Sequence, residues 1–170
     1  GNILFNRSRL MIGHFLMKPC GRILKCDMRT DIYNAETSGT IITDKGSIRF
    51  EVFVHSLDMG IIVKTDASSG ENGFTWQWVS DSPNSPRYDK FKASGNTSKV
   101  VREYKENASA VVDEENRTAL FTYLNGGQTA VRWHISGKGS ARSLYVTCAH
   151  SYPDHNALQL SREYLDRILK

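Results

Sequence analysis

Residues 31–66 read DIYNAETSGTIITDKGSIRFEVFVHSLDMGIIVKTD, and this stretch predicts three consecutive antiparallel strands. The Thr-Asp-Lys-Gly sequence at 43–46 has the composition of a turn between the first strand and the second. The second strand spans Ser47 to His55 and alternates, with one face made of Ile48, Phe50, Val52 and Val54 and the other of Arg49, Glu51, Phe53 and His55. A half-buried strand requires this alternation. The third strand runs from Gly60 to Thr65.

The composition fits one globular domain. The chain has 170 residues, of which 39% are hydrophobic and 24% charged, which is ordinary globular usage. No apolar run reaches the ~18 residues of a membrane span. The apolar segment Leu10 to Met17 lacks the small-residue cleavage site of a signal peptide, so it predicts a strand. We therefore expect neither a membrane span nor a signal peptide within these residues.

The charged residues and the cysteines exclude some partners. The net charge is +4, but the basic residues are scattered among acidic ones, so no nucleic-acid groove is expected. Cys20, Cys26 and Cys148 have neither the spacing of a metal site nor an even count. A Cys20–Cys26 disulfide and three free thiols are both compatible with the sequence.

The second half of the chain predicts further antiparallel hairpins. An aromatic strand covers Phe74 to Val79 and is followed by a long loop, Ser80 to Ser98. Strands are then expected at Lys99 to Tyr104, Ala110 to Asp113, Arg117 to Leu124, Thr129 to Ile135 and Arg142 to Ala149. In the fourth of these, Trp133 shares one face with Val131 and Ile135, while Arg132 and His134 take the other face.

The last residues change to a helical period. Pro153 and Asp154 predict a helix start with Asp154 as the N-cap, and apolar residues then recur at helical spacing to Leu169. We predict an all-β, antiparallel β-sandwich of supersandwich type with one C-terminal α-helix, a closed barrel being the other architecture that such strands form. Residues 1–152 would form the sandwich. Residues 153–170 would form a linker helix that packs on the sandwich or leads to a further domain.

Residues with binding potential fall into two groups. His55, His134 and His150 lie at or near strand ends, so they either are independent or converge on one site. Trp76, Trp78 and Trp133 are either core residues or a stacking platform for sugar rings. No nucleophile elbow, phosphate loop, dinucleotide fingerprint or zinc motif is present. We therefore assign no catalytic residue, metal ligand or cofactor.

The stretch from Asp31 to Trp78 resembles a known domain. The pattern D-I-Y-N-A-E-x-S-G-T-I-x-T-D-K-G-S-I-R-F-x-V-F-V-H-S, then G-I-I-V-K-T and G-E-N-G-F-T-W-Q-W, is similar to the N-terminal β-sandwich that precedes the (α/α)6 barrel of six-hairpin glycosidases, in particular the α-L-fucosidase-like bacterial glycoside hydrolases. The stretch Ala149 to Asp154 and its helix resemble the linker between sandwich and barrel. The first ~25 residues and the Ser80 to Ser98 loop match weakly.

The resemblance implies a non-catalytic domain of a glycoside hydrolase. In that family the catalytic carboxylates lie in the barrel, which would be the partner of this sandwich, and carbohydrate would be bound at the edge of the barrel's cleft. The resemblance also implies a periplasmic or secreted bacterial protein. Two alternatives stay open. One is a stand-alone carbohydrate-binding module that uses the tryptophans. The other is an aldose mutarotase-like sugar epimerase, with its candidate acid–base groups among His55, His134, His150, Glu51 and Glu36.

Overall fold

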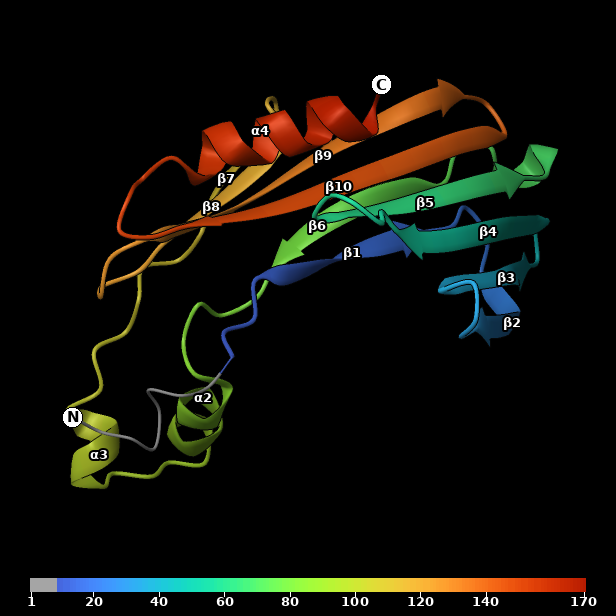
Figure 1. Ribbon diagram of the computed structural model, residues 1–170. Helices are drawn as coiled ribbons and strands as arrows, with labels where there is room; N and C mark the ends of the chain where they lie inside the picture. Colours follow the sequence, from blue (N-terminus) through green and yellow to red (C-terminus); the bar gives the residue numbers. More distant parts are fainter. Residues whose placement is uncertain (1–8) are drawn as a thin grey trace.

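The computed structural model describes residues 9–170, which form two antiparallel β-sheets, three α-helices and one short 3-10 helix (Figure 1). The large sheet has eight strands in the order β2-β3-β4-β5-β10-β9-β8-β7, and the small sheet pairs β1 with β6. The first five strands are β1 Gly13–Lys18, β2 Ile23–Asp31, β3 Glu36–Thr43, β4 Ser47–Val54 and β5 Gly60–Ala67. The others are β6 Thr75–Ser80, β7 Val111–Asp113, β8 Thr118–Thr122, β9 Gln128–Lys138 and β10 Ala141–Ser151. The predicted all-β, sandwich-like fold is confirmed, and the large sheet is open.

The core lies between the two sheets. The β1–β6 ribbon covers the face of the large sheet that is turned away from the C-terminal helix (Figure 1). Trp78 from β6 packs there on Trp133 from β9 and Leu144 from β10, all three buried. The alternation predicted for residues 131–135 is confirmed, because Val131 and Trp133 face this core.

The three-strand meander that the sequence predicts for residues 31–66 is also present. Strands β3, β4 and β5 pair antiparallel in that order. Ile48 pairs with Ala67 and is fully buried, so the apolar face of β4 is the one turned to the small sheet. The turn between β3 and β4 closes through a 2.8 Å hydrogen bond from the Thr43 N–H to the Gly46 carbonyl.

Helix α4, Ala157–Ile168, lies on the opposite face of the large sheet. It packs against β9 and β10 and buries Ala157, Ser161 and Leu165. The Thr147 hydroxyl of β10 donates a 2.9 Å hydrogen bond to the Ser161 carbonyl. The C-terminal helix is therefore confirmed, but the predicted N-cap is wrong. The helix begins after Asn156, because Asp154 belongs to the preceding loop and accepts a hydrogen bond from Ser151 through its carbonyl.

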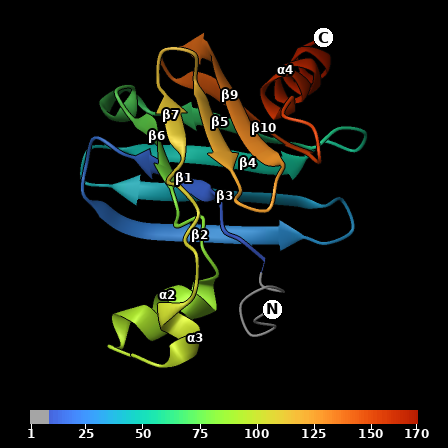
Figure 2. The same cartoon turned by 90° about the vertical axis from the view of Figure 1, so that its left-hand side faces the viewer.

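The predicted loop and strand between β6 and β7 differ from the structure. Helix α2, Pro86–Ala93, lies inside the expected loop, and α3, Lys99–Arg102, replaces the start of the strand expected at residues 99–104. Both helices stand apart from the sheets (Figure 2). Tyr88 and Val101 are buried together in a small cluster of their own, and this local burial outweighs the strand preference of the valines at 100 and 101.

The sequence did not predict the extent of β2. Its residues are exposed on both faces from Ile23 to Thr30, because the β1–β6 ribbon does not reach this edge of the sheet. No apolar period of two is needed in such a strand, so periodicity could not reveal it. Within residues 9–170, no helix has the length and apolar character needed to cross a membrane.

Candidate functional site: a polar groove across four strands

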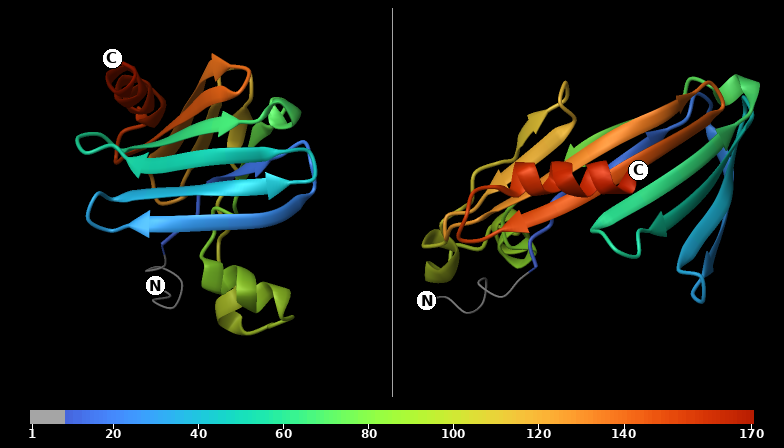
Figure 3. Two further views of the ribbon diagram at one scale, coloured as in Figure 1. Left: turned by 90° about the vertical axis from the view of Figure 1, so that its right-hand side faces the viewer. Right: turned by 45° about the horizontal axis from the view of Figure 1, so that its top comes forward.

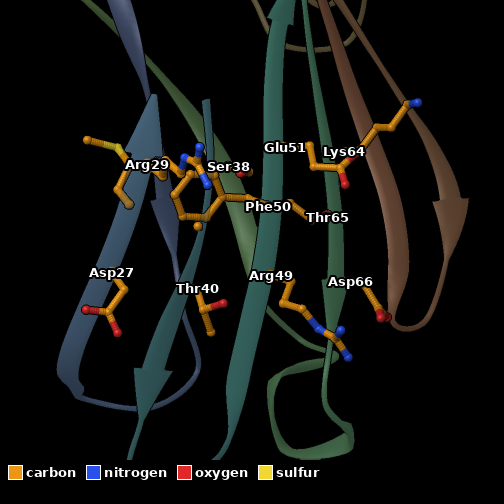
Figure 4. Close-up of a pocket in the computed structure, with 12 residues that line it drawn as sticks. Asp27, Arg29, Ser38, Thr40, Arg49, Phe50, Glu51, Lys64, Thr65 and Asp66 are labelled. Carbon is orange, nitrogen blue, oxygen red and sulfur yellow. The ribbon is translucent and has the colours of Figure 1, made fainter. Parts of the chain in front are cut away.

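A hollow of about 620 Å³ crosses β2, β3, β4 and β5 on one face of the large sheet. We call it the polar groove (Figure 4). It lies on the face that carries α4, since Lys64 pairs with Ser143, and Ser143 and Thr147 lie on the same side of β10. The residues that line it are Asp27, Met28, Arg29, Ser38, Gly39, Thr40, Arg49, Phe50, Glu51, Lys64, Thr65 and Asp66.

Small residues form the floor of the groove. Ser38, Gly39 and Thr40 stand on β3 between the longer side chains of β2 and β4. Gly39 is required for this arrangement, because a Cβ at this position would lie 2.6 Å from the ring of Phe50 and 2.4 Å from the Asp27 carbonyl. The phenyl ring thus packs against β3 from the opposite face. A short polar floor between long side chains is what hollows this part of the sheet.

Charged side chains form the walls, with three of each sign. They are Asp27, Arg29, Arg49, Glu51, Lys64 and Asp66. The strand register alternates the signs, since Arg49 pairs with Asp66 and Glu51 pairs with Lys64. Directly opposite residues on one face of an antiparallel pair lie about 4.5–5.5 Å apart. All six side chains are exposed to solvent. Because the three positive and three negative charges cancel, the groove is densely polar but has no net charge.

This set of groups suits a neutral ligand with many hydroxyls. Carboxylates accept hydrogen bonds, guanidinium and ammonium groups donate them, and the hydroxyls of Ser38 and Thr40 do both. Hydrogen bonds to charged groups are the stronger kind. A balanced arrangement gives no preference for an anion or a cation, but it offers hydrogen-bond donors and acceptors along the whole groove.

The three tryptophans are placed in the interior rather than in this groove. Trp78 and Trp133 are 7% and 5% exposed, and their rings stack at 5.9 Å. Trp76 is half-buried and packs edge-on against Phe74 at 4.9 Å. The guanidinium of Arg142 lies over the Phe74 ring at 3.7 Å. Trp78 and Trp133 therefore take the core role, which was one of the two that the sequence allowed, and Trp76 lies half-buried beside them.

The three histidines lie at separate places. His55 is in the β4–β5 turn, where its Nδ1 accepts a 3.1 Å hydrogen bond from the Asp58 N–H. His134 is on the α4 side of β9, near Tyr145 at 6.3 Å. His150 is on the other face of the sheet and bonds the Thr129 hydroxyl at 3.0 Å. The structure therefore does not bring them together in one site.

The carboxylates considered for an epimerase have different surroundings. Glu51 is in the polar groove, whereas Glu36 pairs with Phe53 at the strand end outside it. In the part of the chain that the structure describes, no three His, Cys, Asp or Glu side chains are grouped so that they could hold a metal ion.

Of the groove residues, sequence reasoning named only Glu51 as a candidate for function. The others were missed because each looks like an ordinary solvent-facing residue of a strand. The available signal was the charge on outward positions of neighbouring strands, such as Asp27 and Arg29 on β2 and Arg49 on β4. Using it required the pairing of β2 with β3, which the pattern did not reveal.

In comparisons with known proteins, no protein-family model and no curated protein matches this chain.

Proposed function

We propose that this chain is a non-catalytic β-sandwich domain of a glycoside hydrolase, which packs against a catalytic barrel and contributes the polar groove to the edge of a carbohydrate cleft. The family is suggested by the resemblance of residues 31–78 to the sandwich of six-hairpin glycosidases. The observation that carries the proposal is the groove itself, an open and charge-balanced surface with a floor of small residues.

An apolar surface near the end of α4 supports the proposal that a second domain packs against this one. Val54, Leu57, Met59 and Ile61 lie in or beside the β4–β5 turn and are between 44% and 88% exposed. This turn contacts the last turn of α4, because Asp58 is paired with Arg167. Exposed apolar groups gathered at one place are typical of interaction sites. They give a second domain a surface on which to pack.

The structure also bears on the two alternative functions, a carbohydrate-binding module and a sugar epimerase. A stand-alone carbohydrate-binding module built on a tryptophan platform would need an exposed indole, and Trp78 and Trp133 are buried. If the chain binds sugar by itself, the groove is the better candidate surface. An epimerase would need its imidazoles and a carboxylate within hydrogen-bond reach, and the separation of the three histidines counts against it.

The test is a titration of the isotope-labelled protein with a panel of neutral oligosaccharides, in which NMR records the chemical shifts of the backbone amides. We expect shifts at β2, β3 and β4, and their loss in Thr40→Arg, which fills the floor. Thr75→Arg places the same side chain at an exposed position of β6 and should bind like the unmodified chain. No sugar should be released from aryl glycosides by this chain.

The link to a catalytic domain is tested in the natural protein that carries this sequence. Thr40→Arg should lower kcat/KM for a polysaccharide and leave kcat/KM for a small aryl glycoside unchanged. The proposal is overturned if no oligosaccharide moves the groove amides, if binding maps to another surface, or if this chain alone hydrolyses glycosides.

A further inference from the structure

The edge strand β2 is unusually open. It has nine residues and pairs only with β3 within the described part of the chain. In Figure 3 it is the outermost strand of the large sheet, with its far side free. Proteins usually protect such an edge with proline, short strands, bulges, charged side chains or a covering element, and of these β2 has charges and one bulge. β2 contains no proline, and its one irregularity lies at its start, between Ile23 and Lys25.

Apolar side chains accompany this free edge. Leu24 and Met28 lie on the face of β2 that is turned toward the small sheet, but they are 57% and 67% exposed. Ile32, directly after the strand, is 90% exposed. These side chains are left uncovered because the β1–β6 ribbon ends before β2. A partner strand along this edge would cover them.

The opposite face of β2 carries charges of alternating sign. Lys25, Asp27, Arg29 and Asp31 follow one another at every second position, so all four point to the same side of the sheet. A series that runs plus, minus, plus, minus is complementary to itself when it is reversed. Antiparallel pairing reverses it.

A register centred on Met28 satisfies both faces of β2. If two β2 strands pair antiparallel about a two-fold axis at Met28, Asp27 lies opposite the second copy's Arg29 and Lys25 lies opposite its Asp31. On the other face, Met28 meets its own copy and Leu24 lies near the second copy's β2–β3 turn, which carries Ile32. Opposite charges placed directly across two strands are stabilising and like charges are destabilising.

The neighbouring registers are unfavourable. A shift of the axis to Asp27 places this carboxylate against its own copy and Lys25 against Arg29, so every facing charged pair would be alike. A slip of one residue turns each side chain to the wrong face. Axes at Cys26 or Thr30 also place opposite charges across from each other, but in two facing pairs rather than the four of the Met28 axis. The number of opposite-charge pairs therefore favours the register that is centred on Met28.

We infer that β2 is a homodimerisation edge, which joins two copies of this chain through antiparallel β2–β2 pairing centred on Met28 into one continuous sheet. The inference is independent of the proposed function, since it concerns association of the protein with itself and needs no carbohydrate. The resulting interface is closed, because a two-fold axis uses the same edge of both copies.

Sedimentation velocity over a concentration series that reaches the millimolar range tests the inference. Asp27→Arg alone and Arg29→Asp alone each create two like-charge pairs across the axis, so each should raise the dimer Kd by about tenfold or more. The double variant Asp27→Arg/Arg29→Asp restores opposite charges and should return the Kd to within about threefold of the original. Lys138→Asp, at the exposed end of β9, is the control and should leave the Kd unchanged.

Mixing gives the sharper readout. Equal amounts of the two single variants should form a heterodimer, because each arginine of one copy then faces an aspartate of the other. A chain that stays monomeric over the whole series overturns the inference. A dimer that is indifferent to both single substitutions, or that the double variant does not restore, overturns it as well. Glycan binding in the groove is a separate measurement, so the two proposals fail independently.

Discussion

The carboxylate of Glu71 accepts a 2.5 Å hydrogen bond from the hydroxyl of Thr43, and both side chains are buried. The same carboxylate accepts the backbone N–H groups of Cys20 at 2.7 Å and Gly21 at 2.8 Å. One side chain from the 3-10 helix Ser69–Glu71 thereby holds the β1–β2 turn and the β3–β4 turn together. These turns set the end of the sheet on which the polar groove is built.

Glu71→Gln should lower the free energy of unfolding by about 1–3 kcal/mol at neutral pH, because an amide cannot accept all three hydrogen bonds and carries no charge. Urea unfolding followed by circular dichroism measures the change. Glu114→Gln, in the exposed turn after β7, is the matched control and should have little effect. A Glu71→Gln protein as stable as the original would contradict the role of this carboxylate.

The stabilisation from Glu71 should also depend on pH. Burial by itself would raise the pKa of this carboxyl, but the hydrogen bonds from Thr43, Cys20 and Gly21 and the charge of Lys45 lower it below its ordinary value of 4.5. A folded-state pKa below the unfolded value gives stability that is complete above about pH 4.5 and is lost as the pH falls through the folded-state pKa. The Tm difference between the original chain and Glu71→Gln should therefore shrink below pH 4.5 and stay constant above it.

Trp133→Ala should destabilise the protein by about 3–5 kcal/mol, because the indole is buried against Trp78 and Phe15 and its removal leaves a cavity. Trp133→Phe keeps most of the apolar volume and should cost less. If the free energy of unfolding is the same for Trp133→Ala as for the original chain, Trp133 is not a core residue. The same burial predicts little change of tryptophan emission from Trp78 and Trp133 when a sugar binds in the groove.

The three cysteines should differ in reactivity. All are free, Cys20 and Cys26 are exposed and Cys148 is half-buried. Burial raises the pKa of the Cys148 thiol, and the thiolate is the reactive form. A thiol reagent at pH 8 should modify two groups quickly in the folded protein and the third only on unfolding. Cys148→Ala should remove the slow group, whereas early modification of all three thiols would contradict the packing of β10.

Arg167→Met should loosen the end of α4. Nε of Arg167 lies 2.8 Å from Oδ1 of Asp58, and Nη2 bonds the same oxygen, so the substitution removes the ion pair that ties the helix to the β4–β5 turn. Hydrogen exchange of the last helical turn should become faster. Arg162→Met, at an exposed position of the same helix, should leave that rate unchanged. Equal rates in the two variants would show that apolar packing alone holds the helix.

Much of the fold could be read from local patterns. The meander of residues 31–66, the later hairpins and the terminal helix were all predictable because alternation and turn residues act within a few positions of the chain. The strand predicted from Lys99 to Tyr104 was wrong because this prediction also used only local preferences. The valines of this segment favour a strand, but they fold as a helix because Val101 and Tyr88 have each other to pack on.

The candidate site was less predictable, since it depends on which strands are neighbours. The sequence by itself determined an antiparallel β fold and the face that each β4 residue takes, because the side-chain period is a local property. Only the tertiary structure decided that Asp27, Ser38, Arg49 and Asp66 lie side by side and that Trp133 is buried. Strand order and register are long-range choices. They are made by the packing of the whole sheet against its small partner sheet and α4, and no single segment encodes them.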